Sequence, residues 1–359
     1  MGARRYLPDG VAKLGDGTVA NTTVRLKQVA ALAGVSSSTV SRAVAKPQTL
    51  HPDTLKRVQA AIASLDYVPF APARVLRSGR TRTIGIVAPT LLNELYALAV
   101  DTLVKESESL NYTVLLTCHR GNQEAEIRCM RALIERGVDG LAIIGSSHHH
   151  SVFALLHRQK LPYVLMWATD RERVHPTVGY DQGRAMMRVT DHLVDLGHRR
   201  FGILPGPLGG HKVSEERLAG AREGLNKFGL TLTPQQVVAT PYDPTAVRRA
   251  TQDLLTREGD VPTALACGND MIAASVIAEC RLLGLDVPDQ LSVTGFGDWE
   301  VSRLISPALT TIHSDAVRIG SLTARNLLSQ IEAGNTDSVQ QIEFEPELIV
   351  RSSTAPPRE

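Results

Sequence analysis

Seven short apolar segments alternate with segments of helical periodicity from Thr83 to near the end of the chain, and this alternation limits the fold more than any other feature. Strands are predicted at Ile84–Ala88, Thr113–Cys118, Gly140–Ile144, Tyr163–Trp167, Phe201–Leu204, Ala264–Cys267 and Leu291–Gly295. Helices are predicted at Tyr96–Leu110, Glu124–Arg136, Val152–Gln159, Gly183–Leu196, Glu216–Phe228, Thr245–Arg257, Asp270–Leu283 and Asp315–Glu332. The alternation predicts an α/β fold of doubly wound parallel sheets with helices on both faces.

The alternating region, residues 83–359, is long enough for two such sheets, since the chain of 359 residues exceeds one ordinary core. The chain is expected to cross between two lobes near Asp181–Gln182 and Thr311–Ser314. Lobe 1 would then hold about residues 83–181 and 314–341, and lobe 2 about residues 182–313 and 342–359. Ligands in such folds bind beyond the carboxyl ends of the strands, which predicts a site in the cleft between the lobes.

A different pattern occupies residues 24–69, where two short helices are predicted to meet at Ala33-Gly34-Val35-Ser36. Gly34 can adopt the positive φ of a C-cap, and the Ser36 hydroxyl can cap the second helix. That helix would turn apolar side chains inward at Val40, Ala43 and Val44. It would turn polar ones outward at Ser37, Ser38, Ser41 and Arg42. Two helices joined by a short turn containing glycine predict a helix-turn-helix, whose second helix reads base edges in the major groove.

Charge is divided unevenly along the chain. Residues 1–80 hold 12 Lys/Arg and 4 Asp/Glu, a net charge of +8, and the remaining 27 Lys/Arg and 33 Asp/Glu give residues 81–359 a net charge of −6. A basic N-terminal module on a mildly acidic body is expected of a protein that binds a polyanion through that module.

The segment from Val24 to Pro69 resembles the DNA-binding headpiece of the lactose-repressor (LacI/GalR) family. The residues that carry the resemblance are Val29-Ala30, Ala33-Gly34-Val35-Ser36, Thr39-Val40-Ser41-Arg42 and Tyr67-Val68-Pro69. Residues 70–82 follow as the family's hinge, and the region after them resembles periplasmic sugar-binding proteins, as the family's effector domain does. Headpiece, hinge and α/β domain stand in the family's order, so the resemblance covers nearly the whole chain from Val24.

The resemblance implies which residues contact DNA. They are Ser36, Ser37, Ser38, Thr39, Ser41 and Arg42 in the headpiece, and Leu76 in the hinge. Leu76 matches the residue that wedges into the minor groove and bends the operator in relatives. Two positions depart from the family's pattern, since Arg25 replaces a capping Thr and Ala45 replaces an Asn after the recognition helix.

The resemblance also implies an effector pocket. Arg217 matches an arginine that grips an effector hydroxyl or carboxylate, Asn269 begins the polar pair at the next strand end, and Tyr96 matches an aromatic residue at the mouth of the first lobe. The other expected effector-binding residues are Trp167, Asp181, His211, Tyr242 and Asp298.

One departure in the pocket bears on the ligand. The family usually places two adjacent acids after Gly-Phe or Gly-Tyr, and here Gly297 replaces the first acid while Asp298 keeps the second. Loss of that acid makes the pocket less negative, which favours an anionic effector such as a sugar acid of the gluconate type or a phosphorylated sugar. Arg217 would hold it, with help from His211 or Lys212.

Several function classes are disfavoured. No apolar run approaches the roughly 20 residues of a membrane span, and the N-terminus lacks a signal-peptide core. The four cysteines, Cys118, Cys129, Cys267 and Cys280, have no CxxC spacing, which is typical of reduced core thiols in a cytoplasmic protein without a metal. Residues 1–23 are expected to form a disordered tail. The catalytic motifs GxSxG and HExxH are absent, and no cofactor is expected.

We therefore expect a cytoplasmic, homodimeric transcriptional repressor that binds operator DNA and is released by a sugar or sugar acid. No leucine-heptad tail follows Val350, so tetramerisation through a C-terminal coiled coil is not expected. The alternative is a corepressor-dependent regulator of the purine-repressor type, and a more remote one is a Rossmann-type enzyme.

Overall fold

The computed structural model describes residues 24–68, 79–257, 261–334 and 339–358. The chain divides after Arg80 into two compact units. The predicted tail and most of the predicted hinge, Leu76 included, lie outside the described residues. Within the described ranges, no helix combines the length and the apolar character that crossing a membrane requires.

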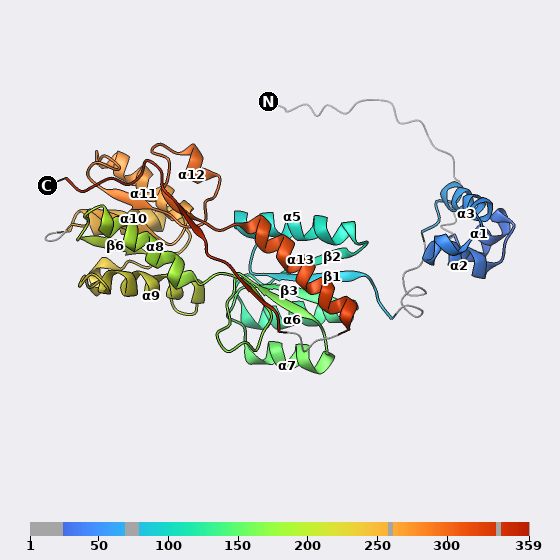
Figure 1. Ribbon diagram of the computed structural model, residues 1–359. Coiled ribbons are helices and arrows are strands. Elements are labelled where there is room, and N and C mark those ends of the chain that lie inside the picture. Colours follow the sequence, from blue (N-terminus) through green and yellow to red (C-terminus); the bar gives the residue numbers. More distant parts are fainter. Residues whose placement is uncertain (1–23, 69–78, 258–260, 335–338, 359) are drawn as a thin grey trace, which may run out of the picture. The chain divides into compact units, whose positions relative to one another are not determined.

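The N-terminal unit is a small helical bundle (Figure 1). Its elements are α1 (Leu26–Ala33), α2 (Ser37–Ala45), the 3-10 turn η1 (Pro47–Thr49) and α3 (Pro52–Ser64). Gly34 has a φ of 63° and ends α1, and the Ser36 hydroxyl accepts a hydrogen bond from the Thr39 N–H at the start of α2. Val40 of α2 is fully buried with Val29 and Val58, so each helix contributes to one core. The predicted helix-turn-helix is confirmed.

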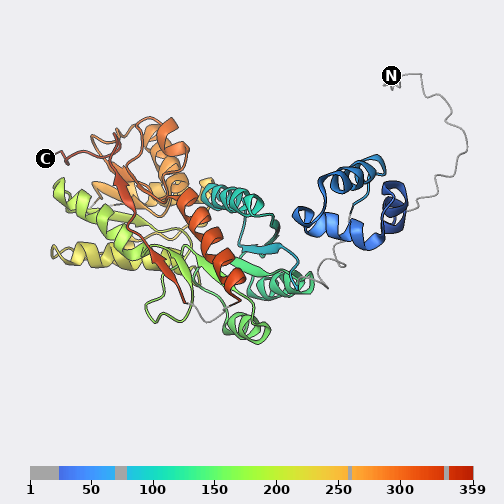
Figure 2. The ribbon, with the colours of Figure 1, turned by 45° about the vertical axis from the view of Figure 1, so that its right-hand side comes forward.

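The first lobe of the C-terminal unit is built on a six-stranded parallel sheet with the order β10-β5-β4-β3-β1-β2. Its strands are β1 (Thr83–Ala88), β2 (Thr113–Cys118), β3 (Gly140–Ile144), β4 (Tyr163–Met166), β5 (Thr177–Gly179) and β10 (Gln341–Glu343). Its helices are α5 (Glu94–Ser109), α6 (Gln123–Glu135), α7 (His150–Gln159) and α13 (Ala316–Ala333). Figures 1 and 2 show α5 and α13 on one face of the sheet and α6 and α7 on the other.

Alternating side chains hold these layers together. Ile84 and Ile86 of β1 pack in the cluster that includes residues of α5 and α13, whereas Val87 packs in the cluster formed with α6 and α7. All three are fully buried, which explains why β1 is a continuous apolar run.

The second lobe has a three-stranded parallel sheet with the order β6-β7-β8. Its strands are β6 (Phe201–Leu204), β7 (Ala264–Cys267) and β8 (Ser292–Thr294). Its helices are α8 (Gln182–Asp195), α9 (Lys212–Asn226), α10 (Pro244–Leu255), α11 (Asp270–Leu282) and α12 (Val301–Leu304), with the 3-10 turn η2 (Pro234–Gln236). Helices α8 and α9 cover one face, and α10 and α11 cover the other (Figure 1).

Two glycines bring α8 and α9 into close contact. A Cβ atom added to Gly220 would lie 2.1 Å from the carbonyl oxygen of Gly183, so neither helix could approach the other this closely with larger residues. The contact lies beside Gln182 and Arg217, and it therefore fixes the spacing between these two side chains.

The chain passes between the lobes three times. It enters lobe 2 after β5, returns through β9 (Thr311–His313), and crosses again from β10 to β11 (Glu347–Ile349), which pairs antiparallel with β9. β10 pairs with β5, so the lobe 1 sheet extends beyond residue 341, the boundary that the sequence suggested. The predicted doubly wound α/β fold is confirmed, with an added antiparallel pair at the crossing.

Candidate functional site

The outer face of α2 carries the side chains that the sequence assigned to DNA. Arg42 and Ser38 are exposed, whereas Ser37, Thr39 and Ser41 are half-buried. The Ser36 hydroxyl is already engaged, because it caps α2 and lies 2.7 Å from the Ser38 hydroxyl oxygen. Arg25, at the N-cap of α1, makes no side-chain cap, and its backbone N–H donates instead to Gln28 Oε1 at 2.6 Å.

A cavity of about 940 Å³ lies between the two lobes of the C-terminal unit. Lobe 1 lines it with residues after β1, β2 and β4, and lobe 2 lines it with the beginnings of α8, α9, α10 and α11. Six of the eight predicted effector-binding residues line this cavity: Tyr96, Trp167, His211, Arg217, Tyr242 and Asn269. The cavity thus lies where the sequence predicted a cleft.

Arg217 is held in a fixed orientation. Its Nε and Nη2 atoms donate to Gln182 Oε1 at 2.9 and 2.8 Å, and its Nη1 donates to the Gly268 carbonyl at 2.5 Å. The guanidinium carbon lies 3.6 Å from the centroid of the Phe296 ring, a cation–π contact. A guanidinium has five N–H groups, and these three hydrogen bonds do not use all of them.

Two aromatic side chains form the lobe 1 wall. The rings of Tyr96 and Trp167 meet edge to face with centroids 5.0 Å apart. The Trp167 indole donates to the Ser314 hydroxyl at 3.1 Å. Burial raises the pKa of Tyr96 to about 12, against the opposing effect of Arg217, so its phenol stays protonated near neutral pH.

Three carboxamides line the cavity, and each uses its oxygen within the protein. Asn93 Oδ1 caps α5 through the N–H groups of residues 95 and 96, and Asn269 Oδ1 caps α11 through the Ile272 N–H at 2.8 Å. Gln182 Oε1 accepts from Arg217. The oxygens of Asn93 and Gln182 each accept two hydrogen bonds and that of Asn269 accepts one, and each amide also offers an NH₂ group, which can only donate.

The charges of the cavity favour an anion. The residues that line it include two arginines, Arg120 and Arg217, and one aspartate, Asp243. Asp243 is engaged, because its Oδ2 accepts from the Ala246 N–H at 2.8 Å and caps α10. The cavity thus presents positive charge and hydrogen-bond donors.

His211 and Tyr242 lie at the rim, with ring centroids 5.8 Å apart. Partial burial and the nearby charge of Arg217 lower the pKa of His211, which keeps its ring neutral near pH 7. Lys212, considered with His211 as a holder of an acid, forms an ion pair with Glu216 at 3.7 Å and does not line the cavity.

Asp181 does not line the cavity, contrary to the expectation from sequence. Its Oδ1 accepts from the Arg184 N–H at 3.0 Å and caps α8, and its Oδ2 pairs with Arg171 at 3.2 Å. The next residue, Gln182, provides the cavity contact instead.

Asp298 is also outside the cavity. Its side chain is only 3% exposed, and its carboxylate accepts from Arg351 at 2.6 Å, Arg303 at 2.8 Å and His313 at 3.0 Å. Burial alone would raise the pKa of Asp298, but the hydrogen bonds from Arg303 and Arg351 outweigh burial and lower it. Asp298 therefore ties the α12 region to the crossing strands.

Sequence reasoning missed Gln182, Phe296, Trp299 and Cys118, all of which line the cavity. Cys118 was expected to be a core thiol and is exposed, whereas Cys267 and Cys280 are buried as expected. Gln182 adjoins the predicted crossing point, which was the one available signal for it.

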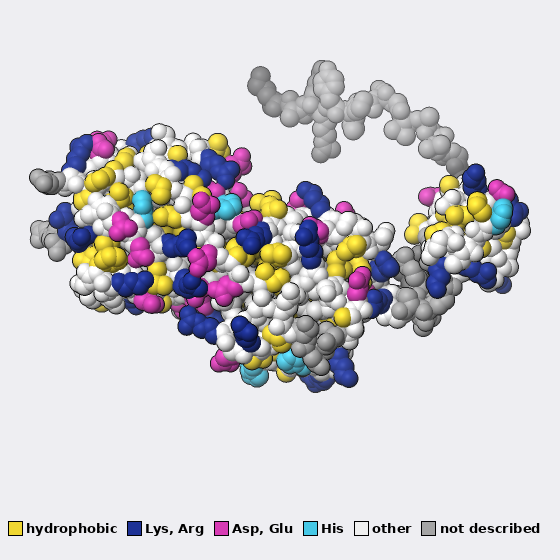
Figure 3. Space-filling model, viewed as in Figure 1, with side chains coloured by type: hydrophobic (Ala, Val, Ile, Leu, Met, Phe, Trp, Pro, Cys, Tyr) yellow, Lys and Arg dark blue, Asp and Glu magenta, His cyan; other side chains and the backbone are white. Residues whose placement is uncertain are grey.

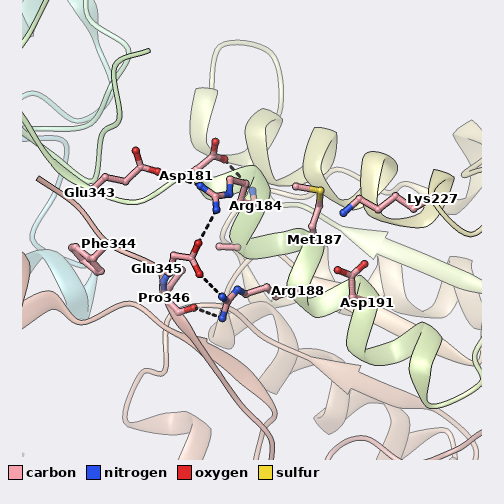
Figure 4. A pocket seen from close by; sticks show the side chains of 11 residues that line it. Asp181, Arg184, Met187, Arg188, Asp191, Lys227, Glu343, Phe344, Glu345 and Pro346 are labelled. Carbon is pink, nitrogen blue, oxygen red and sulfur yellow. Dashed lines mark hydrogen bonds and ion pairs between the residues drawn. The ribbon is translucent and has the colours of Figure 1, made fainter. Parts of the chain in front are cut away.

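A second pocket of about 190 Å³ lies between α8 and the segment after β10 (Figure 4). Arg184 and Arg188 both point to Glu345, at 2.7 and 2.5 Å. The two arginines thus form ion pairs with a carboxylate of the same chain. These ion pairs hold α8 against the segment after β10. On the face drawn in Figure 3, basic and acidic side chains also intermingle over the C-terminal unit.

Comparison with known proteins identifies both units. Residues 25–69 match the bacterial regulatory proteins of the lacI family, and residues 190–354 match the periplasmic binding protein-like domain. The HTH-type transcriptional repressor PurR of Aliivibrio fischeri is 32% identical over 335 residues, which cover 92% of this chain and 98% of that protein.

Solved structures agree with this comparison. The lac repressor dimer bound to operator and the anti-inducer ONPF superposes with a TM-score of 0.82 at 27% identity, over 93% of this chain and all of that one. The complex of the regulator CelR with cellobiose has a TM-score of 0.68 at 26% identity, over 92% of this chain and 99% of that one. The chain belongs to the lacI family of bacterial regulatory proteins and is a DNA-binding transcriptional repressor.

Proposed function

We propose that this repressor is regulated by a small acidic sugar derivative, a sugar acid or a phosphorylated sugar, which binds in the interlobe cavity and releases the protein from its operator. The observation that carries the proposal is the donor-rich lining of the cavity. Three carboxamides use their oxygens in hydrogen bonds within the protein and offer NH₂ groups, and the lining holds two arginines but only one aspartate, whose carboxylate caps α10.

A neutral sugar fits this lining less well than an acid. Each sugar hydroxyl both donates and accepts, so it gains most where the wall offers acceptors as well as donors. A carboxylate or phosphate only accepts, and hydrogen bonds to charged groups are worth about 1.5–3 kcal/mol. The volume of about 940 Å³ lies near the upper end of ordinary ligand pockets, and aromatic rings can cover the apolar face of the ligand.

We further propose that Ser37, Ser38, Thr39, Ser41 and Arg42 read each operator half-site. Arg42 is the exposed cation on the outer face of α2, and arginine pairs with guanine through two hydrogen bonds. Two copies would form a homodimer on a near-palindromic operator, with Leu76 of each hinge inserted in the minor groove.

Regulation requires only that the effector bind one state of the protein more tightly than the other. The cavity is lined from both lobes, so a ligand inside it would favour the closed arrangement of the lobes. Release from DNA follows if the closed arrangement is incompatible with operator binding.

The second candidate is the opposite effect of the ligand on operator binding. In this case a purine acts as corepressor and strengthens binding to the operator. It is favoured by the name PurR of curated relatives that are 31–32% identical to this chain. A planar base could stack on the aromatic rings of the cavity, but it would not account for a lining that holds two arginines and a single aspartate, whose carboxylate caps α10.

One pair of measurements tests the proposal. Operator fragments are selected from genomic DNA with the full-length protein, and their binding is then titrated with D-gluconate, D-glucose and hypoxanthine. We expect gluconate to weaken operator binding and glucose and hypoxanthine to have no effect. Tighter binding with hypoxanthine would establish the corepressor alternative, and release by glucose alone would refute the acidic effector. Recovery of unchanged gluconate checks that the cavity binds without turnover.

A further inference from the structure

Trp299 carries a buried donor without a protein partner. The residue lines the interlobe cavity and is 9% exposed, and its Nε1 atom has no hydrogen-bond acceptor among the residues that the structure describes. An unsatisfied buried polar group destabilises the folded state, and such groups in folded proteins need an explanation. A ligand that provides an acceptor atom would supply one.

The indole is fixed by its surroundings. Gly297 has a φ of 131°, and a Cβ atom on it would lie 2.4 Å from Trp299 Nε1 and 2.5 Å from Cδ1. The ring therefore packs directly on the Gly297 backbone, a contact that only glycine permits. The Trp299 backbone N–H donates to the buried carboxylate of Asp270 at 2.6 Å, which holds the residue from lobe 2.

The second tryptophan of the chain provides an internal comparison. Trp167 lines the same cavity, but its indole N–H donates to the Ser314 hydroxyl at 3.1 Å. The two indoles share chemistry and location and differ in whether the protein satisfies the N–H. Among the described residues the protein thus provides an acceptor for one indole N–H of the cavity and none for the other.

We propose that Trp299 is a specificity-determining residue whose indole N–H donates to an acceptor atom of the bound effector, a carboxylate oxygen if the effector is a sugar acid. This inference deepens the proposed function and rests on it. The contact adds a fixed, uncharged donor to the donors of Arg217 and the carboxamides.

The position of Trp299 also connects the ligand to the lobes. The next backbone N–H, of Glu300, donates to Glu94 Oε1 of lobe 1 at 3.0 Å. Leu95 Cδ1 would lie 3.3 Å from a Cβ on Gly297. Two adjacent residues of lobe 1, Glu94 and Leu95, therefore lie close to the segment that contains Trp299. A ligand bound to Trp299 would therefore lie next to the residue, Glu300, that forms a hydrogen bond between the lobes.

The experiment uses the fact that the chain has only two tryptophans. Full-length protein labelled with ¹⁵N-tryptophan gives two indole N–H resonances, which W167F and W299F assign. The protein is titrated with D-gluconate, D-glucose and hypoxanthine. With the ligand that binds, we expect the Trp299 resonance to move downfield, as a new hydrogen bond requires, and to move further than that of Trp167.

Calorimetry on the variants gives a second readout. W299F keeps an aromatic ring but removes the donor, and we expect it to weaken binding of the same ligand at least about tenfold, the effect of a hydrogen bond to a charged group. W167F is the matched control, because it removes an indole whose N–H is satisfied by Ser314, and it should weaken binding less than W299F does. Thermal unfolding of both variants checks that they are folded.

The inference is overturned if the Trp299 resonance stays in place at saturation, if W299F binds as tightly as the unchanged protein, or if no probe moves the resonance. Its failure is distinguishable from failure of the proposed function. If glucose or hypoxanthine binds and moves the Trp299 resonance, the sugar-acid proposal fails while the role of Trp299 is supported. If gluconate releases the operator without moving that resonance, the sugar-acid proposal is supported and the proposed role of Trp299 fails.

Discussion

Arg217 on α9 and Gln182 on α8 form a fork, in which two guanidinium nitrogens donate to a single amide oxygen at 2.9 and 2.8 Å. The fork depends on the close approach of Gly183 and Gly220, which brings the two helices together. Because the amide oxygen is neutral, Arg217 keeps its full positive charge towards the cavity while its orientation is fixed.

Replacing Gln182 with glutamate should weaken binding of an acidic effector. Glutamate has nearly the same shape, but its carboxylate would neutralise Arg217 and add a negative charge beside the ligand. We expect the affinity for D-gluconate to fall at least about tenfold, or about 1.4 kcal/mol. Calorimetric titration measures the change, and Glu215→Gln serves as a control because Glu215 does not line the cavity. Unchanged affinity in Q182E would contradict an anion at this position.

Asp298 should affect stability more than ligand contact. Asp298→Ala leaves Arg351, whose side chain is 16% exposed, without its carboxylate partner. Breaking such a buried pair lowers the free energy of unfolding by about 3–5 kcal/mol. We expect a loss of about 3 kcal/mol, because the Arg303 side chain is exposed and its ion pair contributes less. Urea denaturation monitored by circular dichroism measures it. Full stability together with lost effector binding would restore the role that the sequence suggested for Asp298.

Most elements were predictable from sequence because most of the longer strands are buried apolar runs and most helices have a regular apolar stripe. The strands at Thr113–Cys118, Gly140–Ile144, Phe201–Leu204 and Ala264–Cys267 agree with the structure residue for residue. β5, β9, β10 and β11 were missed, since three residues provide no periodicity. Each of them pairs with a strand far away in the sequence or across a crossing, a contact that the local sequence does not reveal.

The site was predictable where a residue matches the family's motif, as Arg217 on α9 and Asn269 after β7 do, and less so where the backbone turns. Arg217 and Asn269 line the cavity as expected. Asp298 has a φ of 57°, and its carboxylate meets Arg351 and Arg303 in place of the cavity. No sequence pattern reveals that turn. The same turn makes Trp299, one residue later, a lining residue.

Arg42→Ala should weaken binding to the cognate operator by about 1–3 kcal/mol and relax base preference at one position of each half-site. The reason is the loss of a bidentate contact from the exposed face of α2. Gel-shift titrations with the operator and with single-base variants measure both effects. Lys56→Ala on α3 is the charge-matched control, and it should show no base dependence. An equal loss on operator and random DNA in R42A would identify Arg42 as a phosphate contact.

The stability of the protein should fall as the pH rises from about 4 to 6 because of Asp270. Burial raises the pKa of Asp270 to about 6, although hydrogen bonds from the Thr311 hydroxyl and the Trp299 N–H oppose the rise. In the unfolded chain the pKa is about 3.9, so the folded state binds the proton more tightly. The stabilisation by that proton is complete below about pH 4 and is lost as the pH passes 6, a change of about 3 kcal/mol.

Asp270→Asn should remove this pH dependence. The asparagine oxygen can still accept from the Trp299 N–H, and its NH₂ can donate to the Thr311 hydroxyl, so these two hydrogen bonds are kept while the titration is lost. Urea unfolding at several pH values between 4 and 7 compares the two proteins, and Asp289→Asn at an exposed ion pair controls for the change of charge. A slope that persists unchanged in D270N would assign the titration to another group.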